Sequence, residues 1–284
     1  MKNKQRNHCL YTLLFFTFVI TEAIAGSGKL LATSGITQIE GSGGGGIVPW
    51  ATIAGYGSKD EISASAFYSQ ANLDDYRLHV LGANIGLYDR LELSVAKQTF
   101  DLTSLGGEIE QTIYGAKVKV YGDVIYSQWP QLSVGIHHKE LKHPLIARAL
   151  GAKNTSSGTD FYVAATKVNL GFLYGYNTVW NITGRFSKGN ELGLLGFGSS
   201  AEKDYQFLLE ASVGVLLSRH WAIGLEYRQK PDNLGLKEDD WVDAFVAYLP
   251  NKEFSLTLAW AKLGTIAGAK KQDGLFLTMT GKLW

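Results

Sequence analysis

Large apolar side chains alternate with small or polar ones along much of this 284-residue chain. In residues 254–261 the apolar members are Phe254, Leu256, Leu258 and Trp260, and the residues between them are Ser, Thr or Ala. Successive side chains of a β-strand point to opposite faces, so this alternation predicts strands with one apolar and one polar face. The same pattern recurs at residues 91–96, 132–137, 176–183 and 221–228.

Residues 1–25 are predicted to be a secretory signal peptide. Positive charges at positions 2, 4 and 6 precede a short apolar run at residues 10–20, and Ala23-Ile24-Ala25 matches a small-x-small cleavage site. The run is too short for a spanning helix, which needs about 20 residues, so a single-pass anchor is the weaker interpretation. The only cysteine, Cys9, lies in this leader. The mature chain is therefore expected to have no disulfide, thiol nucleophile or thiolate metal site.

The connections between the predicted strands favour a membrane barrel over a soluble β-sandwich, which would also contain amphipathic strands. Short connections at residues 88–90, 218–220 and 250–252 are separated by long ones. Short periplasmic turns and long extracellular loops are typical of outer-membrane barrels. The long connections are expected at residues 102–109, 141–159, 187–204, 230–239 and 264–274.

The expected fold is all-β, a transmembrane antiparallel up-and-down β-barrel of about fourteen strands with both ends in the periplasm. Residues 26–46 are rich in glycine and form either the first strand or an N-terminal plug, and a plug leaves about twelve strands. The expected barrel then covers residues 47–284. The fourteen strands are expected at residues 29–38, 47–56, 62–70, 77–87, 91–101, 111–121, 131–140, 160–169, 176–186, 205–217, 221–228, 240–249, 253–263 and 275–284.

Four segments of the chain resemble a known family. They are GGGGIVPWA at residues 43–51, DFYVAATK at 160–167, GLLGFG at 193–198 and KPDNLG at 230–235. Together they resemble a proteobacterial family of outer-membrane β-barrel-like proteins catalogued as a domain of unknown function, DUF3034, and the similarity covers the mature chain. The resemblance implies an exported protein of the outer-membrane type, and it brings no activity and no catalytic residues.

Composition and residue spacing argue against several classes of function. Lys and Arg total 27 against 26 Asp and Glu, with no basic block, so no nucleic-acid partner is expected. His137 and His138 are adjacent and should point to opposite faces of a strand, so they cannot share one metal. No nucleophile motif is present, and we expect no enzyme activity, catalytic residue, cofactor or metal. The expected partners are outer-membrane lipid, the barrel-assembly machinery and a small polar solute.

Tryptophans beside the predicted turns and loops have two interpretations. Trp129 and Trp221 lie beside predicted periplasmic turns and Trp241 beside a predicted outer loop. An aromatic girdle at the membrane interface is the favoured interpretation, and a carbohydrate or aromatic-ligand site is the alternative.

Charged residues on the predicted inward faces indicate a functional interior. If the apolar face of each strand meets lipid, a basic run and then a largely acidic run line the lumen, with Arg228 the exception in the second run. The basic run is Lys117, Lys119, His137, Lys139, Lys167 and Arg185, and the second run is Glu210, Glu226, Arg228 and Asp243.

Two arrangements of these charges are possible. They could border a water-filled passage with a transverse field, or they could pair across a narrow interior and fill it with salt bridges. The first arrangement predicts a monomeric channel or transporter for small polar solutes. The second predicts a non-conducting structural or interaction barrel.

Overall fold

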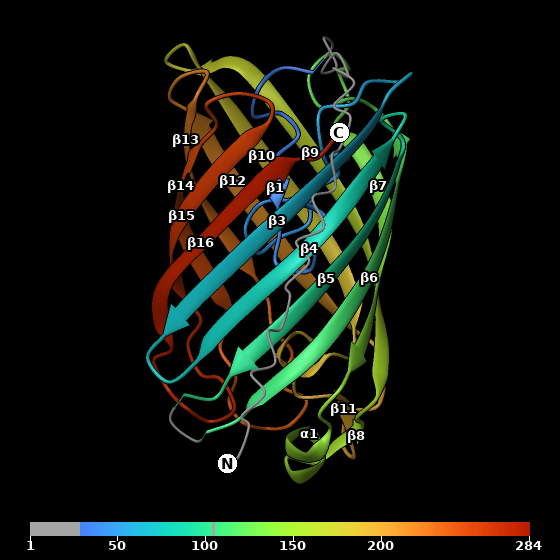
Figure 1. The fold of residues 1–284 in the computed structure, drawn as a ribbon, viewed down its shortest axis with the longest axis vertical. Helices are drawn as coiled ribbons and strands as arrows, with labels where there is room; N and C mark the ends of the chain where they lie inside the picture. The colour runs from blue at the N-terminus through green and yellow to red at the C-terminus, as the bar shows by residue number, and fades with distance from the viewer. Residues whose placement is uncertain (1–28, 104–105) are drawn as a thin grey trace, which may run out of the picture.

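The wall of the molecule is a closed antiparallel barrel of twelve strands (Figure 1). The computed structural model describes residues 29–103 and 106–284, so the predicted signal peptide and Cys9 lie outside the described residues. Successive strands are neighbours around the wall, and the last strand pairs with the first from Gly274↔Leu73 to Lys282↔Ser65. Closure leaves no strand edge exposed, which a membrane requires because lipid cannot satisfy backbone polar groups. The strands are β3 Ile62–Leu73, β4 Arg77–Leu87, β5 Leu91–Asp101, β6 Glu108–Tyr121, β7 Gln131–Leu141, β9 Ser157–Leu173, β10 Tyr176–Ser187, β12 Gln206–Leu216, β13 Trp221–Arg228, β14 Trp241–Tyr248, β15 Phe254–Lys262 and β16 Asp273–Lys282.

The predicted all-β barrel is confirmed, but the count of fourteen strands is wrong and the alternative of twelve is right. The first two expected strands, at residues 29–38 and 47–56, do not join the wall. The first contributes only β1 (Ile36–Thr37), which pairs with β2 (Gly43–Gly44) in the segment between the two expected strands, and the second contributes no strand. The wall therefore begins at Ile62 rather than at residue 47.

Residues 29–56, which we call the plug, lie inside the barrel, where Figure 1 shows them in blue behind β3 and β4. Every residue from Thr37 to Ala54 is buried. A wall strand would bury only alternate residues on its inner face, so this burial on all sides shows a segment surrounded by protein. Gly35 and Gly41 have φ angles of 72° and 101°, which allow the chain to turn back on itself within the lumen.

The outer face of the wall is apolar where the alternation predicted contact with lipid. Leu258 is 48% exposed and Trp260 56%, whereas Thr257 between the strand's outward residues is only 1% exposed. Large apolar residues are exposed in the same way on the other strands, for example Leu81 and Val163. A continuous apolar belt of this extent is rare on monomeric soluble proteins and typical of outer-membrane-type barrels. Among the described residues, no helix is long and apolar enough to cross a membrane.

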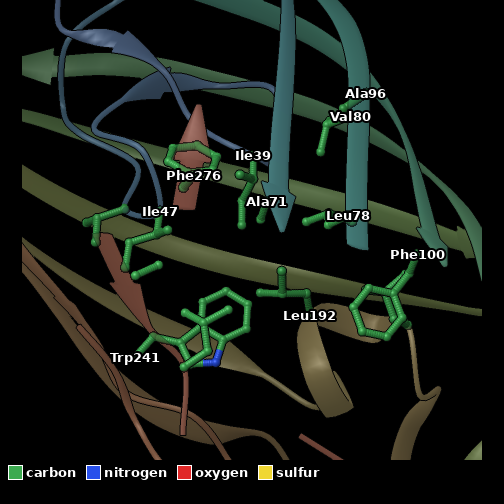
Figure 2. Close-up of a cluster of buried hydrophobic side chains, with 14 of the residues drawn as sticks. Ile39, Ile47, Ala71, Leu78, Val80, Ala96, Phe100, Leu192, Trp241 and Phe276 are labelled. Atoms are coloured by element: carbon green, nitrogen blue, oxygen red, sulfur yellow. The ribbon is translucent and has the colours of Figure 1, made fainter. Parts of the chain in front are cut away.

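The aromatic girdle is only partly as expected. Trp129 and Trp221 are 64% and 46% exposed, the first within the β6–β7 connection and the second at the start of β13. Trp241 is 4% exposed and faces the interior, because it shares the inward phase of β14 with Asp243. Its ring lies near Ile47 of the plug in Figure 2.

The two ends of the barrel differ. At one end, the turn end, lie most of the short connections and the C-terminus, and at the other, the loop end, lie most of the long connections (Figure 1). Two connections break the rule, since residues 74–76 are a short turn at the loop end and residues 122–130 a longer one at the turn end. The loop end also carries four short elements: α1 (Leu145–Ala149), β8 (Ala152–Asn154), η1 (Asn190–Gly193) and β11 (Phe197–Ser199).

Leu258→Arg should lower the free energy of unfolding by about 2 to 4 kcal/mol, because the residue lies mid-strand on the lipid face. Leu283→Arg is the matched control, since Leu283 follows the end of β16 and is 67% exposed near the interface, where the cost should be about 0 to 1 kcal/mol. Urea titration of folding into lipid vesicles measures both. Equal costs at the two positions would show that β15 is not embedded as described.

Candidate functional site

The interior of the barrel is organised around the carboxylate of Glu40, which lies in the plug and is fully buried. Lys139 Nζ lies 2.6 Å from Glu40 Oε1, and Arg185 and Arg228 each place a guanidinium nitrogen 2.9 Å from Oε2. These three cations come from β7, β10 and β13. One carboxylate of the plug therefore joins three separate strands of the wall.

Two wall carboxylates complete this group, which we call the Glu40 cluster: Glu40, Lys139, Asp160, Arg185, Glu210 and Arg228. Asp160 lies 2.6 Å from Lys139 and 3.2 Å from Arg185, and Glu210 accepts from Arg185 Nε at 2.7 Å. The cluster thus holds three cations and three anions. Buried charges are tolerated when they are paired and hydrogen-bonded in this way.

Glu92 of β5 and Lys117 of β6 bind a second part of the plug. Glu92 accepts from the backbone amides of Gly43 and Ala54 at 3.0 and 2.7 Å. Lys117 Nζ donates to the carbonyl oxygens of Gly43 and Thr52 and forms an ion pair with Glu92 at 2.9 Å. The pair therefore hydrogen-bonds backbone groups on both arms of the plug, at Gly43 and at Thr52 and Ala54.

Glu226 of β13 binds the plug at a third place. Its Oε2 accepts from the amides of Gly46 and Ile47 at 2.6 and 2.9 Å, and Ser212 donates to Oε1 at 2.7 Å. A Cβ on Gly45 would lie within 1.7 Å of Glu226 Oε1, so only glycine allows this approach. Asp243 faces Glu226 on the neighbouring strand and is 2% exposed.

An apolar cluster packs the plug against the other side of the wall. Figure 2 shows Ile39 and Ile47 of the plug among side chains from β3, β4, β16 and the loop end. Phe276 and Leu192, 2% and 7% exposed, belong to this cluster. The plug is thus held by the Glu40 cluster and Glu226 on the β7–β13 side, by the Glu92–Lys117 pair at β5 and β6, and by apolar packing in the cluster of Figure 2.

The loop end is covered by connections that fold over the plug. Lys230 Nζ lies 2.9 Å from Glu191 and 2.7 Å from Glu238, which joins the β10–β12 and β13–β14 connections. Burial raises the pKa of Glu191 to about 7 against the opposing charge of Lys230, and Glu238 adds to the increase. Gln111 also donates to the Leu192 carbonyl oxygen at 3.3 Å, so β6 holds the same connection from inside.

The structure places nine of the ten residues predicted to face the lumen inside the barrel. Eight of them are at most 5% exposed: Lys117, His137, Lys139, Arg185, Glu210, Glu226, Arg228 and Asp243. The ninth, Lys119, points inward at the turn end, where it forms an ion pair with Asp89.

Lys167 is the exception, and its predicted position in the lumen is wrong. It shares the outward phase of Phe161 and Val163, and its Nζ reaches the carbonyl oxygens of Ile125 and Ser127 in the β6–β7 connection. A lysine stem can lie along an apolar surface while the ammonium group reaches polar groups at the membrane boundary.

The predicted division into a basic and an acidic wall is replaced by local pairing. Glu92 and Asp160 stand among the basic residues, and Glu40 reaches cations on both sides of the predicted boundary. The sequence analysis did not identify these three acids as lumen residues. The alternation around Glu92 could have revealed it, since it shares a polar phase with Ser94, but no local pattern marks Glu40 in the glycine-rich segment.

His137 and His138 point to opposite faces, as the strand period requires. His137 is fully buried 4.0 Å from Glu40, whereas His138 lies on the outer face and makes a hydrogen bond with Thr159. Within residues 29–103 and 106–284, no group of three or more His, Cys, Asp or Glu side chains is placed to hold a metal ion.

A family model described as "Protein of unknown function (DUF3034)" matches residues 33–280, which include both plug and wall. The chain belongs to this family. The match confirms the resemblance found in the four sequence segments. The comparison with curated proteins gives no match.

Several solved structures are similar in fold at low identity. KdgM porin is 11% identical with a TM-score of 0.49, over 76% of this chain and 98% of that chain. Omp33 of Acinetobacter baumannii is 8% identical with a TM-score of 0.46, over 80% and 100%. Outer membrane phospholipase A from Escherichia coli is 8% identical with a TM-score of 0.41, over 78% and 92%. These likenesses are too distant to carry an argument about function.

Glu40→Gln should lower the free energy of unfolding by about 3 to 5 kcal/mol, because it leaves three buried cations with two anions. Glu110→Gln is the control, since Glu110 pairs with Lys97, which is about half exposed, on the outer surface and should cost less than about 1 kcal/mol. Urea titration in lipid vesicles compares the two. A Glu40 variant no less stable than the Glu110 variant would contradict the anchoring role of this carboxylate.

Proposed function

We propose that the protein is a channel or transporter for small polar solutes in the bacterial outer membrane, closed in the described conformation by its plug. The observation that carries the proposal is the independence of the wall. All twelve strands pair in a closed ring without any residue of the plug, so the plug can move without breaking a wall hydrogen bond. Barrels of eight strands are filled by their own side chains, and wider barrels enclose a lumen. In this protein the lumen is occupied by a separate segment, the plug.

The chemistry of the plug contacts supports reversible opening. The Glu40 cluster, Glu92 and Glu226 hold the plug by ion pairs and hydrogen bonds. All of these groups except Glu40 belong to the wall and would remain as a polar lining after the plug moved. Water could then solvate the exposed charges. A wall with cations and anions at one level suits small polar solutes better than apolar ones.

A non-conducting structural or interaction barrel is the second candidate. The full burial of residues 37–54 and the neutral Glu40 cluster favour it, because paired charges and packed side chains leave little space for a solute in this conformation. The two candidates differ in one measurable property, which is whether the plug ever leaves the conducting path.

Single-channel recording in planar lipid bilayers tests the proposal. The wild-type protein should be closed most of the time with rare openings, and Glu40→Gln should open more often because the plug loses its central anion. Linking the plug to β5 should abolish those openings. A Cβ on Gly41 would lie 3.3 Å from Cβ of Ala96, close to the separation that a disulfide spans, so Gly41→Cys with Ala96→Cys in the Glu40→Gln background provides the link.

Two controls separate plug movement from other effects. Reduction of the disulfide should restore the openings, and Gly41→Cys alone shows the effect of placing a side chain at φ 101° without a cross-link. If folded wild-type and Glu40→Gln proteins both fail to conduct, the channel is excluded and the non-conducting barrel is the better account. Openings that persist in the oxidised double variant would show that the path does not depend on the plug.

A further inference from the structure

Three buried side chains, which we call the loop-end clasp, join three connections over the plug: Glu191, Lys230 and Glu238. Lys230 Nζ donates to Glu191 Oε2 at 2.9 Å, to Glu238 Oε2 at 2.7 Å and to the Thr265 carbonyl oxygen at 2.8 Å. The β10–β12, β13–β14 and β15–β16 connections, which together we call the cap, supply these groups. All three donors of one ammonium group are therefore used to hold the cap together.

The clasp contains two carboxyl groups and one ammonium group, and its side chains are at most 6% exposed. Glu238 accepts at both oxygens, because the amide of Ala267 donates to Oε1 at 2.9 Å. Glu191 Oε1 has no hydrogen-bond partner among the described residues. With both acids ionised, the clasp holds one unpaired negative charge away from water, and a proton on Glu191 makes it neutral.

The surroundings of Glu191 oppose its ionisation. A small cavity between the cap and the plug is lined by Glu191 together with Ile47, Trp241 and Phe276, and Glu191 is the only charged residue among the described residues of this lining. Burial raises the pKa of Glu191 to about 7 against the opposing charge of Lys230. The carboxyl group that lacks a donor is thus also the one in apolar surroundings.

The backbone at this point depends on its contacts. Glu191 and Leu192 have φ angles of 45° and 62°, in the left-handed region that residues other than glycine rarely adopt. Such a conformation persists only while the surrounding structure holds it. The clasp contributes to this, as does a neutral hydrogen bond of 2.9 Å from Asn233 to Asn190. Of these two contacts between the β10–β12 and β13–β14 connections, only the clasp can titrate.

We propose that the loop-end clasp makes closure of the cap depend on pH: a proton on Glu191 keeps the cap closed over the plug, and loss of that proton to water loosens it. The inference deepens the proposed function and rests on it for its role, which is control of access to the plug from the loop end. The opening of the cap itself can be measured without any conductance.

The direction of the effect follows from proton linkage. The closed cap binds the proton of Glu191 more tightly than an open cap, in which water surrounds the carboxyl group. The stabilisation of the closed cap is therefore fully present below the ordinary pKa of glutamate and is lost as the pH rises through about 7.

Two further titratable groups near the clasp, among the described residues, are Tyr76 of the β3–β4 turn and Asp239. Burial raises the pKa of the Tyr76 hydroxyl and the nearby carboxylates raise it further, so Tyr76 stays neutral near pH 7. Hydrogen bonds from Thr265 lower the pKa of Asp239, so Asp239 stays ionised. Neither group changes its charge in the range where Glu191 does.

Hydrogen exchange of residues 189–198 in the refolded full barrel measures opening of the cap, once corrected for the intrinsic pH dependence of exchange. The amides of Leu195 and Gly198 are bonded within this segment of the closed cap, to the carbonyl oxygens of Asn190 and Lys188. Protection in the wild-type protein should fall about tenfold or more from about pH 5 to about pH 8, while β15 stays protected. Protection that is constant or rises with pH would overturn the proposal.

Two variants separate the proton from a merely structural role. Glu191→Gln keeps the shape of the protonated acid and cannot ionise, so its protection should be the same at both pH values and should exceed that of the wild-type protein at about pH 8. Asn233→Ala is the matched control, because it removes the neutral bond between the same two connections. It should lower protection at both pH values and leave the pH effect intact. A Glu191→Gln cap that remains as pH-dependent as the wild-type cap, or is less protected at about pH 8, would contradict the proposal.

The exchange and conductance assays fail separately. A cap that loosens with pH on a barrel that never conducts refutes the channel and keeps the clasp. A conducting barrel whose cap is equally protected at both pH values refutes the clasp alone.

Discussion

The ion pairs of Glu40 are the interaction on which the interior depends. Lys139, Arg185 and Arg228 are buried in the wall and all point at this one carboxylate. Without it, the wall members of the Glu40 cluster would be three cations and two anions in a space from which water is excluded, and such unpaired charge is costly. The wall therefore specifies an anion at its centre, and the plug supplies it.

The width of the barrel explains why a plug is needed. The inner faces carry small residues such as Ser, Thr, Gly and Ala at many positions, and their side chains alone do not reach across the lumen. Residues 37–54 fill this space as irregular chain, whose backbone polar groups need partners. Glu92, Lys117 and Glu226 provide them, so the polar side chains of the wall replace the sheet hydrogen bonds that the segment lacks.

Most of the wall was predictable because its signal is local. The alternation at residues 254–261 correctly placed Leu258 outside and Thr257 inside, and the same rule placed nine of the ten charged residues. It failed at Lys167, where both phases of β9 carry apolar residues. Phe161 and Val163 compete with Tyr162 and Ala164, and only the pairing with β7 and β10 decides the phase.

The plug was less predictable because its contacts are distant in sequence. Glu40 and Arg228 are 188 residues apart, and Gly46 and Glu226 are 180 apart. Nothing in the glycine-rich segment shows which wall residues it meets, although its glycine content did leave a plug as the alternative to a first strand. The partners follow from barrel closure, which brings β7, β10 and β13 around a single point.

Hydrogen exchange of the plug amides tests the central claim most directly. Peptides covering residues 38–54 of the folded protein, followed by mass spectrometry, should exchange as slowly as those from β15, because Gly43, Gly46 and Ala54 donate to buried carboxylates. The β9–β10 turn, where Tyr174 is 97% exposed, serves as the fast reference. A plug that exchanges as fast as this turn while β15 stays protected would contradict the account of a lumen closed by a firmly bound segment.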